Sequence, residues 1–396
     1  MGDVLDDMYN GQTPSRNKSE YWNGNIKWLS SGELNRGTVY DSMEMITEDG
    51  QKSANLRIVP KGTFIMAITG LEAAGTRGNC ALLGFDTTLN QSCMALFPKK
   101  DLLTSDFLFQ WYRKVGEEYG INYTQGTKQQ SYNAELIKIL PISLPSVAEQ
   151  RKIASYLSNL DHLITLHQRK CDEVKSLKKY MLQKMFPQNE QKVPEIRFEG
   201  FTEAWEQRKL GDLVDRVTRK NQDLVSELPL TISAQYGLID QNEFFDKRVA
   251  SKDVSGYYLI ENGEFAYNKS TSTDAPWGAI KRLDRYENGV LSTLYIVFGI
   301  KENNPVDSDF LVSYYNTNLW HKGIHEIAAE GARNHGLLNI APADFFETKL
   351  MIPQDIEEQK KIGKYFEELE RLITLHQQKC EELKKIKKFM LQKMFV

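Results

Sequence analysis

The sequence has few cysteines and no long apolar run. Its four cysteines form no CxxC pair and no disulfide framework, which favours a reducing cytoplasm as the location. No apolar stretch approaches the ~20 residues of a membrane helix, and no signal-peptide pattern opens the chain. These absences exclude a disulfide-stapled secreted domain, and they give no reason to expect a membrane partner.

Catalytic motifs are missing as well. The sequence has no GxxxxGK[ST] loop for ATP and no glycine-rich fingerprint for a methyl-donor nucleotide. The stretch Asn268-Lys269-Ser270 is not the Asn-Pro-Pro-Phe/Tyr signature of adenine methyltransferases. We therefore expect no catalytic residues, no metal and no cofactor in this chain, and a free-standing enzyme is disfavoured.

An internal repeat is the main clue to function. Residues 150–186 recur 209 residues later as residues 359–395, and both copies close with Met-Leu-Gln-Lys-Met-Phe. The segments between the copies are much less alike. A chain built as variable, constant, variable, constant carries one scaffold twice and presents two different surfaces.

Both copies are expected to be long helices that pair with each other. The first copy has no Gly or Pro from residue 154 to 186, and the second has one interruption, Gly363. Apolar or semi-apolar residues follow a heptad pattern, which makes a narrow stripe that requires a partner helix. Pro187 would end the first helix. The expected pairing positions are Ile153, Leu157, Leu160, Ile164, His167, Cys171, Val174, Ile362, Phe366, Leu369, Ile373, His376, Cys380 and Leu383.

Two His–Cys pairs lie on that stripe, His167 with Cys171 and His376 with Cys380. Because His and Cys are zinc ligands and each pair shares one helix face, a four-ligand zinc site is an alternative. We favour the simpler interpretation, in which cysteine acts as a small hydrophobe and histidine helps to fix the helix register.

The net charge of −3 is unevenly distributed. The repeated segments, 150–186 and 359–396, each carry a net charge of +5, whereas residues 1–149 carry −3 and residues 187–358 carry −10. The chain as a whole therefore lacks the charge of a typical nucleic-acid binder. Any DNA contact must come from local basic clusters or with help from a partner protein.

The segments outside the repeat predict two related α+β domains. Each has short β-like runs, an aromatic helix-like stretch (105–112 or 308–315), a polar Gly-led loop, and a short apolar strand that ends in proline (142–145 or 351–353). The expected division is 1–149 for the first domain, 150–186 for a helix, 187–210 for a linker, 211–358 for the second domain and 359–396 for a helix.

The two domains begin alike, because Gly2-Asp3-Val4 matches Gly211-Asp212-Leu213. The second beginning is preceded by residues 198–210, and these have no counterpart ahead of Met1. We therefore expect that the sequence lacks a natural N-terminal stretch or begins late.

Short phrases occur in a fixed order along the chain. Each domain ends with Leu-Pro or Ile-Pro, and a Glu-Gln pair then opens the long helix. The phrases are Gln12-Thr-Pro-Ser15, Tyr21-Trp22, Glu149-Gln150, Pro194-Glu-Ile-Arg-Phe198, Trp205-Glu-Gln-Arg-Lys-Leu-Gly211-Asp212 and Glu358-Gln359. Together with the duplication, this ordered set resembles the specificity subunit of type I restriction-modification enzymes over nearly the whole chain.

The resemblance implies two target-recognition domains, each reading one half of a split double-stranded DNA site. It implies antiparallel helices as a spacer, in an internal pseudo-twofold repeat. Two modification (methyltransferase) subunits would dock on the helices, and restriction/translocase subunits would join them. Adenine methylation with S-adenosylmethionine, and DNA cleavage with ATP and Mg, would then belong to these partners, while this chain is non-catalytic.

Polar loops supply the candidate DNA contacts, because Arg, Lys, Asn and Gln read base edges and Arg and Lys bind phosphates. The loops at Gly126 and Gly331 are the main candidates, and the alternative for each loop is a solvated turn. The first domain offers Arg16, Lys18, Arg77, Lys128, Gln129, Gln130 and Tyr132. The second offers Lys269, Ser270, Thr271, Lys281, Arg282, Arg333, Asn334 and His335.

A second hypothesis remains open, a non-enzymatic coiled-coil adaptor or scaffold that joins partners without reading DNA. Footprinting with and without a modification subunit separates the two hypotheses. Two separated half-sites would favour DNA reading, whereas no footprint under any condition would favour the adaptor.

Overall fold

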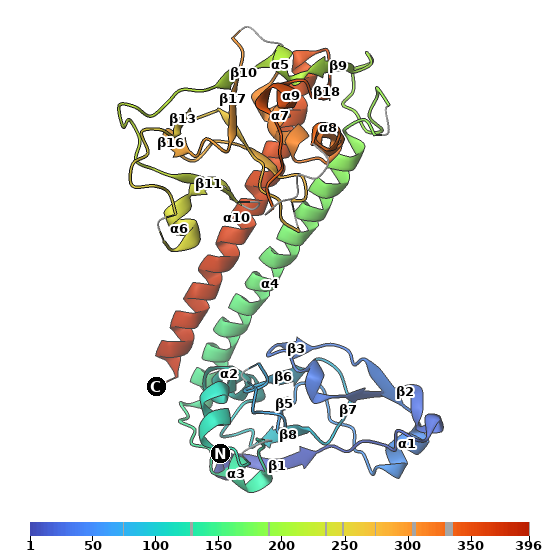
Figure 1. The fold of residues 1–396 in the computed structure, drawn as a ribbon. Helices are drawn as coiled ribbons and strands as arrows, with labels where there is room; N and C mark the ends of the chain where they lie inside the picture. Colours follow the sequence, from blue (N-terminus) through green and yellow to red (C-terminus); the bar gives the residue numbers. More distant parts are fainter. Residues whose placement is uncertain are drawn as a thin grey trace. The chain divides into compact units, whose positions relative to one another are not determined.

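The chain forms two compact units in the computed structural model. Unit 1 comprises Met1–Gln168 with Gln377–Val396, and unit 2 comprises Arg169–His376. The long helices α4 (Val147–Lys184) and α10 (Ile356–Met394) each contribute residues to both units (Figure 1). The structure describes residues 1–73, 75–126, 130–188, 191–233, 236–247, 249–273, 275–302, 306–328 and 336–395.

Unit 1 is built on a five-stranded sheet with the order β1-β8-β5-β6-β3, in which all neighbours are antiparallel except β3 and β6. A smaller sheet has the order β4-β2-β7. The strands are β1 (Leu5–Asn10), β2 (Trp22–Leu29), β3 (Thr38–Val39), β4 (Glu44–Ile46), β5 (Phe64–Ala67), β6 (Cys80–Leu83), β7 (Thr88–Leu89) and β8 (Cys93–Pro98).

Helix α2 (Ser105–Asn122) covers the larger sheet of unit 1, and α1 (Glu48–Ser53) and α3 (Ala134–Lys138) are short. Thr104 caps α2, since its hydroxyl accepts a hydrogen bond from the Phe107 amide at 3.3 Å. The apolar face of α2, including Phe107 and Trp111, is buried in one core with the sheet. Leu157 of α4 and Phe395 after α10 join the same core, so the long helices are integral to unit 1.

Unit 2 has a four-stranded sheet with the order β10-β17-β14-β15 and three two-stranded pairs, β11-β12, β13-β16 and β18-β9. Its strands are β9 (Glu206–Lys209), β10 (Val214–Val217), β11 (Leu230–Ser233), β12 (Gly237–Asp240), β13 (Tyr258–Glu261), β14 (Phe265–Asn268), β15 (Ala279–Arg282), β16 (Asn288–Leu291), β17 (Ile296–Ile300) and β18 (Lys349–Ile352). Its helices, besides parts of α4 and α10, are α5 (Leu210–Leu213), α6 (Gln241–Phe245), α7 (Ser308–Tyr315), α8 (Leu319–Ile327) and α9 (Pro342–Phe346).

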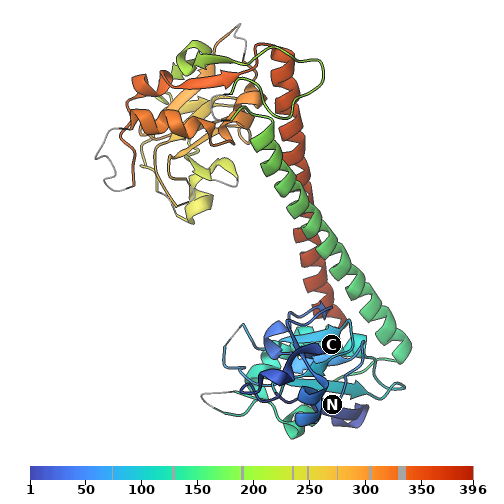
Figure 2. The same ribbon diagram turned by 90° about the vertical axis from the view of Figure 1, so that its right-hand side faces the viewer.

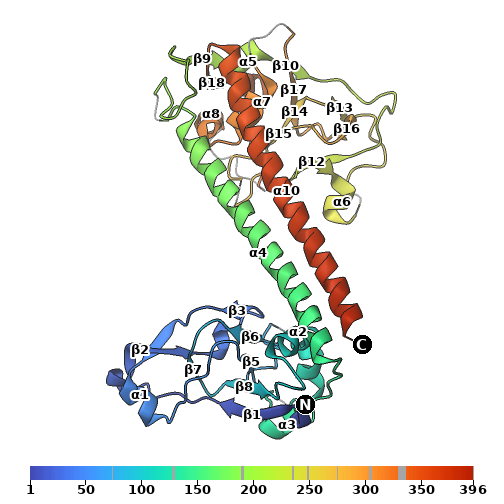
Figure 3. The same cartoon turned by 180° about the vertical axis from the view of Figure 1, so that it is seen from behind.

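Helices α4 and α10 run side by side in opposite directions within each unit (Figures 2 and 3). In unit 2, the Cys171 thiol of α4 lies 4.0 Å from the Ile373 carbonyl oxygen of α10. In unit 1, the Cys380 thiol of α10 lies 4.0 Å from the Ile164 carbonyl oxygen of α4. Every one of the fourteen positions of the expected pairing stripe is buried or half-buried.

Glycine at position 363 has a packing reason. A Cβ atom there would lie 2.7 Å from the Phe310 amide nitrogen and from the Asp309 Cβ, so glycine lets α10 approach the start of α7 closely. Its counterpart in α4 is Ala154, which is also buried. The one glycine in the second copy of the repeat therefore allows close packing of α10 against α7, and α10 continues through it.

One expected strand is wrong. Residues 351–353 were expected to form a strand, and β18 lies there, but the equivalent residues 142–145 of unit 1 have irregular backbone. The physical reason is the presence or absence of a neighbouring strand. In unit 2, β18 pairs with β9, whereas no described strand of unit 1 lies beside residues 142–145. A strand needs a neighbour to satisfy its backbone groups.

Candidate nucleic-acid interface

Two polar loops that are distant in the sequence lie against each other in unit 1. The Leu71 amide donates to the Gln130 carbonyl oxygen at 3.1 Å, and the Gln130 amide donates to the Glu72 carboxylate at 3.2 Å. The Arg77 guanidinium donates to the carbonyl oxygens of the same two residues, Leu71 at 2.9 Å and Glu72 at 2.8 Å. The structure therefore brings Arg77 and Gln130, two predicted contacts, to one place.

This pairing also limits what some predicted residues can do. Two of the guanidinium's nitrogen atoms donate to carbonyl oxygens of the loop that contains Arg77, so Arg77 positions this loop whatever else it contacts. Tyr132 departs from the expectation of a DNA contact, because its ring is buried in the core with 3% exposed. Burial raises the pKa of Tyr132 to about 12, which keeps the phenol protonated. Its amide donates to the Ile68 carbonyl oxygen and so anchors the loop end.

Unit 2 repeats this arrangement with other residues. The Thr271 amide donates to the Gly336 carbonyl oxygen at 2.7 Å, and the Leu338 amide donates to the Lys269 carbonyl oxygen at 3.0 Å. The predicted stretch Lys269, Ser270 and Thr271 thus lies beside the segment that follows the Gly331 loop. Ser270 is exposed, whereas Lys269 is half-buried, and this partial burial lowers the pKa of its ammonium group.

Five predicted contacts lie outside the described residues. They are Lys128, Gln129, Arg333, Asn334 and His335. Each belongs to one of the two Gly-led loops, whose described neighbours form the hydrogen bonds given above. These neighbours lie beside the turn after β5 in unit 1 and beside the turn after β14 in unit 2.

Arg16 and Lys18 form a separate exposed site in the first unit. The Arg16 guanidinium stacks on Trp22, 3.7 Å from the ring centroid, and forms a forked ion pair with Glu44. This ion pair lowers the pKa of Glu44. Lys18 donates to the Tyr21 hydroxyl at 3.0 Å. Both cations are exposed, and the aromatic rings hold them in defined positions.

Lys281 and Arg282 of β15 face the protein rather than solvent. Arg282 is 16% exposed and pairs with Asp284 at 2.6 Å and Asp309 at 2.7 Å. Lys281 donates to the Asn316 side chain at 3.0 Å, and burial, with Lys178 nearby, lowers its pKa. These contacts tie β15 to the α7 region, so both residues have structural partners where phosphate contacts were predicted.

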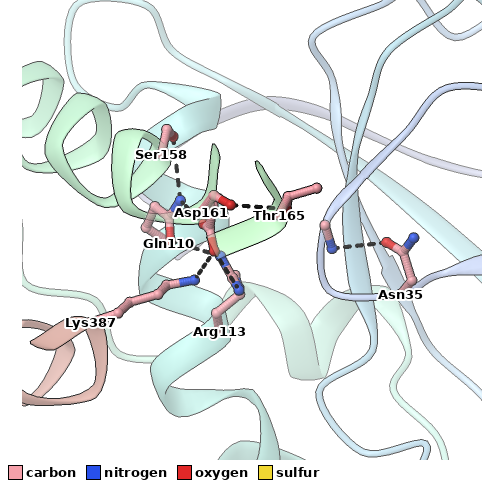
Figure 4. A network of polar contacts seen from close by, with 8 residues as sticks. Asn35, Gln110, Arg113, Ser158, Asp161, Thr165 and Lys387 are labelled. Carbon is pink, nitrogen blue, oxygen red and sulfur yellow. Dashed lines mark hydrogen bonds and ion pairs between the residues drawn. The ribbon is translucent and has the colours of Figure 1, made fainter. Parts of the chain in front are cut away.

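A polar network joins α2 to both long helices in unit 1 (Figure 4). Asp161 of α4 accepts from Arg113 of α2 at 2.5 Å and pairs with Lys387 of α10. Gln110, which is fully buried, lies within 3.4 Å of Ser158 and Asp161. Burial and the neighbouring Arg113 lower the pKa of Lys387 to about 8, despite the Asp161 partner.

Several of these positioning residues are not among the predicted site residues. Arg36 donates to the Arg77 carbonyl oxygen and, at 3.3 Å, to Asn79, which supports the turn after β5 from behind. No sequence motif marks Arg36. Asp161 and Lys387, in contrast, could have been found from the repeat, because their counterparts are Glu370 and Lys178, and those two also form an ion pair.

The cysteines of the two His–Cys pairs, Cys171 and Cys380, are buried and form no disulfide. Cys80 and Cys93 of unit 1 are also buried and free, and desolvation raises the pKa of the Cys80 thiol to about 12. Within the described residues, no group of three or more His, Cys, Asp or Glu side chains is arranged to hold a metal ion. In the same part of the chain, no helix is both long and apolar enough to span a membrane.

The comparisons with known proteins identify the family. A family model described as the type I restriction modification DNA specificity domain matches residues 1–176 and again residues 202–385. The chain therefore belongs to this family, and the two matches coincide with the internal duplication.

Individual relatives agree with this assignment. The type I restriction enzyme MjaIX specificity subunit of Methanocaldococcus jannaschii is 29% identical over 220 residues, which is 53% of this chain and 50% of the relative. The EcoR124I/EcoR124II specificity subunit of Escherichia coli is 27% identical over 161 residues, 39% of this chain and 38% of the relative. The aligned part thus spans half or less of these relatives. A crystal structure of the type I restriction-modification S subunit from M. genitalium shares the fold, with a TM-score of 0.63, 15% identity, and coverage of 100% of this chain and 94% of that one.

Proposed function

We propose that this chain is the DNA-reading specificity subunit of a type I restriction-modification complex. Each globular part reads one half of a bipartite target, and the paired helices set the gap between the halves and carry two modification subunits. One observation above all supports the proposal: in each unit the turn after an equivalent strand, β5 or β14, is hydrogen-bonded to the segment that follows a polar Gly-led loop, and the residue types differ between the two units.

The side chains in these loops suit base and phosphate recognition. Lys and Arg donate to phosphates and to guanine edges, while Gln and Asn form two hydrogen bonds with adenine. In unit 1 the turn that contains Arg77 and the backbone of Gln130 are hydrogen-bonded to the same two residues, Leu71 and Glu72, and the sequence of the adjoining loop supplies Lys128 and Gln129. In unit 2 the corresponding loop carries Arg333, Asn334 and His335. Different residues on one frame would give two different half-sites.

Arg16 and Lys18 are proposed as additional phosphate or groove contacts of the first unit. Both are exposed, and the stacking of Arg16 on Trp22 orders a side chain that is otherwise flexible. Pre-ordering lowers the entropy lost on binding. Lys281 and Arg282 are proposed instead to stabilise the fold of unit 2. Arg282 already forms ion pairs with two carboxylates, and Lys281 already donates to the Asn316 amide.

Partner subunits are needed for both affinity and chemistry in this proposal. The globular segments carry net negative charge, so they attract duplex DNA poorly over long range. The basic helices, at +5 each, offer a platform that occurs twice. Methylation with S-adenosylmethionine and cleavage with ATP and Mg are assigned to the modification and restriction subunits, as no catalytic motif was found in this chain.

The test is methylation mapping on a randomised DNA library with the chain and its modification subunit. A bipartite consensus with a fixed gap is expected. Exchanging residues 211–358 for those of a relative should change one half of the consensus and leave the other intact. A chain that assembles with partners but confers no sequence preference would instead be an adaptor. The adaptor hypothesis is disfavoured because the DNA specificity domain model matches the chain twice.

A further inference from the structure

The turn ahead of β6 in unit 1, residues 75–78, rests on the second half of α2. Two buried glycines of this helix, Gly116 and Gly120, face the turn. A Cβ atom added at Gly116 would lie 2.8 Å from the Gly78 Cα, and one added at Gly120 would lie 3.3 Å from the Arg77 Cβ. Gly78 itself has a φ of +69°. Glycine on both sides therefore brings the turn and the helix into close backbone contact.

Helix α2 is a fixed support for this turn. Its apolar face is buried against the larger sheet, and Arg113 pairs with Asp161 of α4 at 2.5 Å. The turn has a further support in Arg36, whose guanidinium donates to the Arg77 carbonyl oxygen and, at 3.3 Å, to the Asn79 side chain. The position of the turn is therefore set by residues that do not belong to the polar loops.

Unit 2 contains an equivalent turn. Residues 275–278 lie between β14 and β15, as residues 75–78 lie between β5 and β6. Both turns end in a glycine with a positive φ, +69° in unit 1 and +78° in unit 2. The residue ahead of this glycine is Trp277 in unit 2. Its carbonyl oxygen accepts a hydrogen bond from the Tyr267 hydroxyl at 2.9 Å, as that of Arg77 accepts one from an arginine.

The contact between turn and helix differs between the two units. The Trp277 ring lies against His325 of α8, with ring centroids 5.0 Å apart and an angle of 77° between the planes. Trp277 is half-buried and His325 is exposed, so this aromatic pair lies at the surface. In unit 1 the turn instead meets its helix through glycines. The same turn is thus set against its support by two different contacts.

Each turn is also joined to the polar loop of its own unit. In unit 1 the Leu71 amide donates to the Gln130 carbonyl oxygen at 3.1 Å, and Arg77 donates to the Leu71 carbonyl oxygen at 2.9 Å. In unit 2 the Thr271 amide donates to the Gly336 carbonyl oxygen at 2.7 Å. A displacement of one turn therefore acts on the loop segment beside it.

We propose that Gly116 and Gly120 in unit 1 and His325 in unit 2 are positioning residues that determine specificity. Each sets the distance between a turn and the helix that supports it, and thereby the place at which the turn and its polar loop meet the base edges. Direct readout depends on hydrogen bonds of defined length and direction, so a small displacement changes which bases are preferred. This inference rests on the proposed function.

The first variant is Gly120→Ala in the full chain, assembled with its modification subunit. Alanine favours a helix more than glycine does, so the melting temperature should not fall. The added methyl group would lie 3.3 Å from Arg77, so the turn has to move by a few tenths of an ångström. Methylation mapping on a randomised DNA library should show base preference relaxed at least about fivefold at one or more positions of one half-site. The other half-site and the gap should be unchanged.

The second variant, His325→Ala, tests the turn of unit 2. It removes an exposed imidazole, so the fold should persist while Trp277 loses its support. Base preference should change in the half-site that Gly120→Ala leaves intact. The matched controls are Gly32→Ala, an exposed glycine whose added Cβ atom would meet nothing closer than 3.8 Å, and Glu326→Ala, the exposed neighbour of His325 on α8. Both controls should leave the consensus unchanged.

The outcomes separate this inference from the proposed function. A wild-type complex without sequence preference would contradict the proposed function itself. Where the wild type gives a bipartite consensus, an unchanged consensus in either variant overturns the assignment for that unit. A variant that changes both half-sites, or that lowers methylation evenly at every sequence, also overturns it, because a residue that only stabilises the fold acts in this way. A Gly120→Ala chain that fails to fold overturns the assignment for unit 1, and His325→Ala then decides unit 2 alone.

Discussion

Lys387 of α10 forms an ion pair with Asp161 of α4 in unit 1, and the repeat supplies the same pair in unit 2 with the helices exchanged, as Lys178 of α4 and Glu370 of α10. The two lysines stand four residues after Val174 and Leu383, at the next position of the heptad pattern, where the stripe has a polar residue instead of an apolar one. A polar pair at such a position fixes the register and the orientation of two helices, at some cost in stability. The two sites differ in their surroundings, because Arg113 also pairs with Asp161.

This difference gives the first prediction. Asp161→Asn leaves Arg113 and Lys387 close together without a carboxylate, so we expect the free energy of unfolding to fall by about 3 kcal/mol. Glu370→Gln is the matched control from the other unit. Its carboxylate is 53% exposed, so its loss should cost less than about 1 kcal/mol. Chemical denaturation of both variants measures the comparison, and equal losses would show that the Arg113 network adds nothing.

The second prediction concerns pH. The pKa of Lys387 is about 8 in the folded chain, where burial and Arg113 lower it, and near its ordinary value of 10.5 in the unfolded chain. Between these values the unfolded state binds more protons, so this group makes unfolding harder as pH rises from about 8 to 10. The stability of the wild type relative to Lys387→Met should therefore increase over that range, on the order of 1 kcal/mol. A difference that is flat with pH would place the Lys387 pKa near its ordinary value.

Much of the fold was predictable, because the sequence contains the long helix and the matching domain segments twice. The heptad stripe predicted α4 and α10, and the matching aromatic stretches at 105–112 and 308–315 predicted α2 and α7. The strand at 142–145 was not formed, since a strand depends on a neighbour that local sequence does not specify. Sequence alone could show that residue 142 resembles 351, but not what lies beside it.

The candidate interface was less predictable than the fold. Residue type suggested Arg282 and Tyr132 as readily as Gln130, yet Arg282 is paired with two carboxylates and Tyr132 is buried. Burial and pairing arise from tertiary packing, and a single sequence does not report them. The contact between the Arg77 turn and the Gln130 segment was also invisible, because it is made by backbone groups.

The third prediction distinguishes a residue that stabilises the fold, Arg282, from a residue that is proposed to contact DNA, Arg333. Arg282→Ala removes the partner of Asp284 and Asp309, so it should lower thermal stability and weaken binding to all DNA sequences alike. Arg333→Ala should leave stability unchanged and, if Arg333 contacts a base, cost about 1–3 kcal/mol at one position of the second half-site. Binding of a library of single-position target variants by the assembled complex measures both. Loss of sequence preference in Arg282→Ala, with normal stability, would contradict the division.

The fourth prediction concerns the gap between half-sites. Lys178 of α4 lies against Glu370 of α10, so seven residues inserted after Ser176 and seven after Leu372 lengthen both helices at one level and keep the heptad phase. Seven residues add roughly 10 Å of helix, which corresponds to about three base pairs. Methylation mapping should show a gap longer by that amount. The insertion in one helix alone is the control and should lower stability, because it misaligns the stripe. An unchanged gap in the double insertion would show that the helices do not set it.

The fifth prediction concerns dependence on partners. The acidic globular segments meet a densely anionic duplex, so the isolated chain should bind DNA weakly and with little selectivity. Adding the modification subunit should give tight, specific binding, because a second protein supplies positive surface around the duplex. Since the helical platform occurs twice, two copies are expected per chain, which native mass measurement can count.

A titration of electrophoretic mobility against salt then tests the mechanism. The slope of log affinity with log salt should be steeper for the complex than for the chain, because each added phosphate contact releases counterions. Nanomolar specific binding by the chain alone, or a one-to-one complex, would contradict this mechanism.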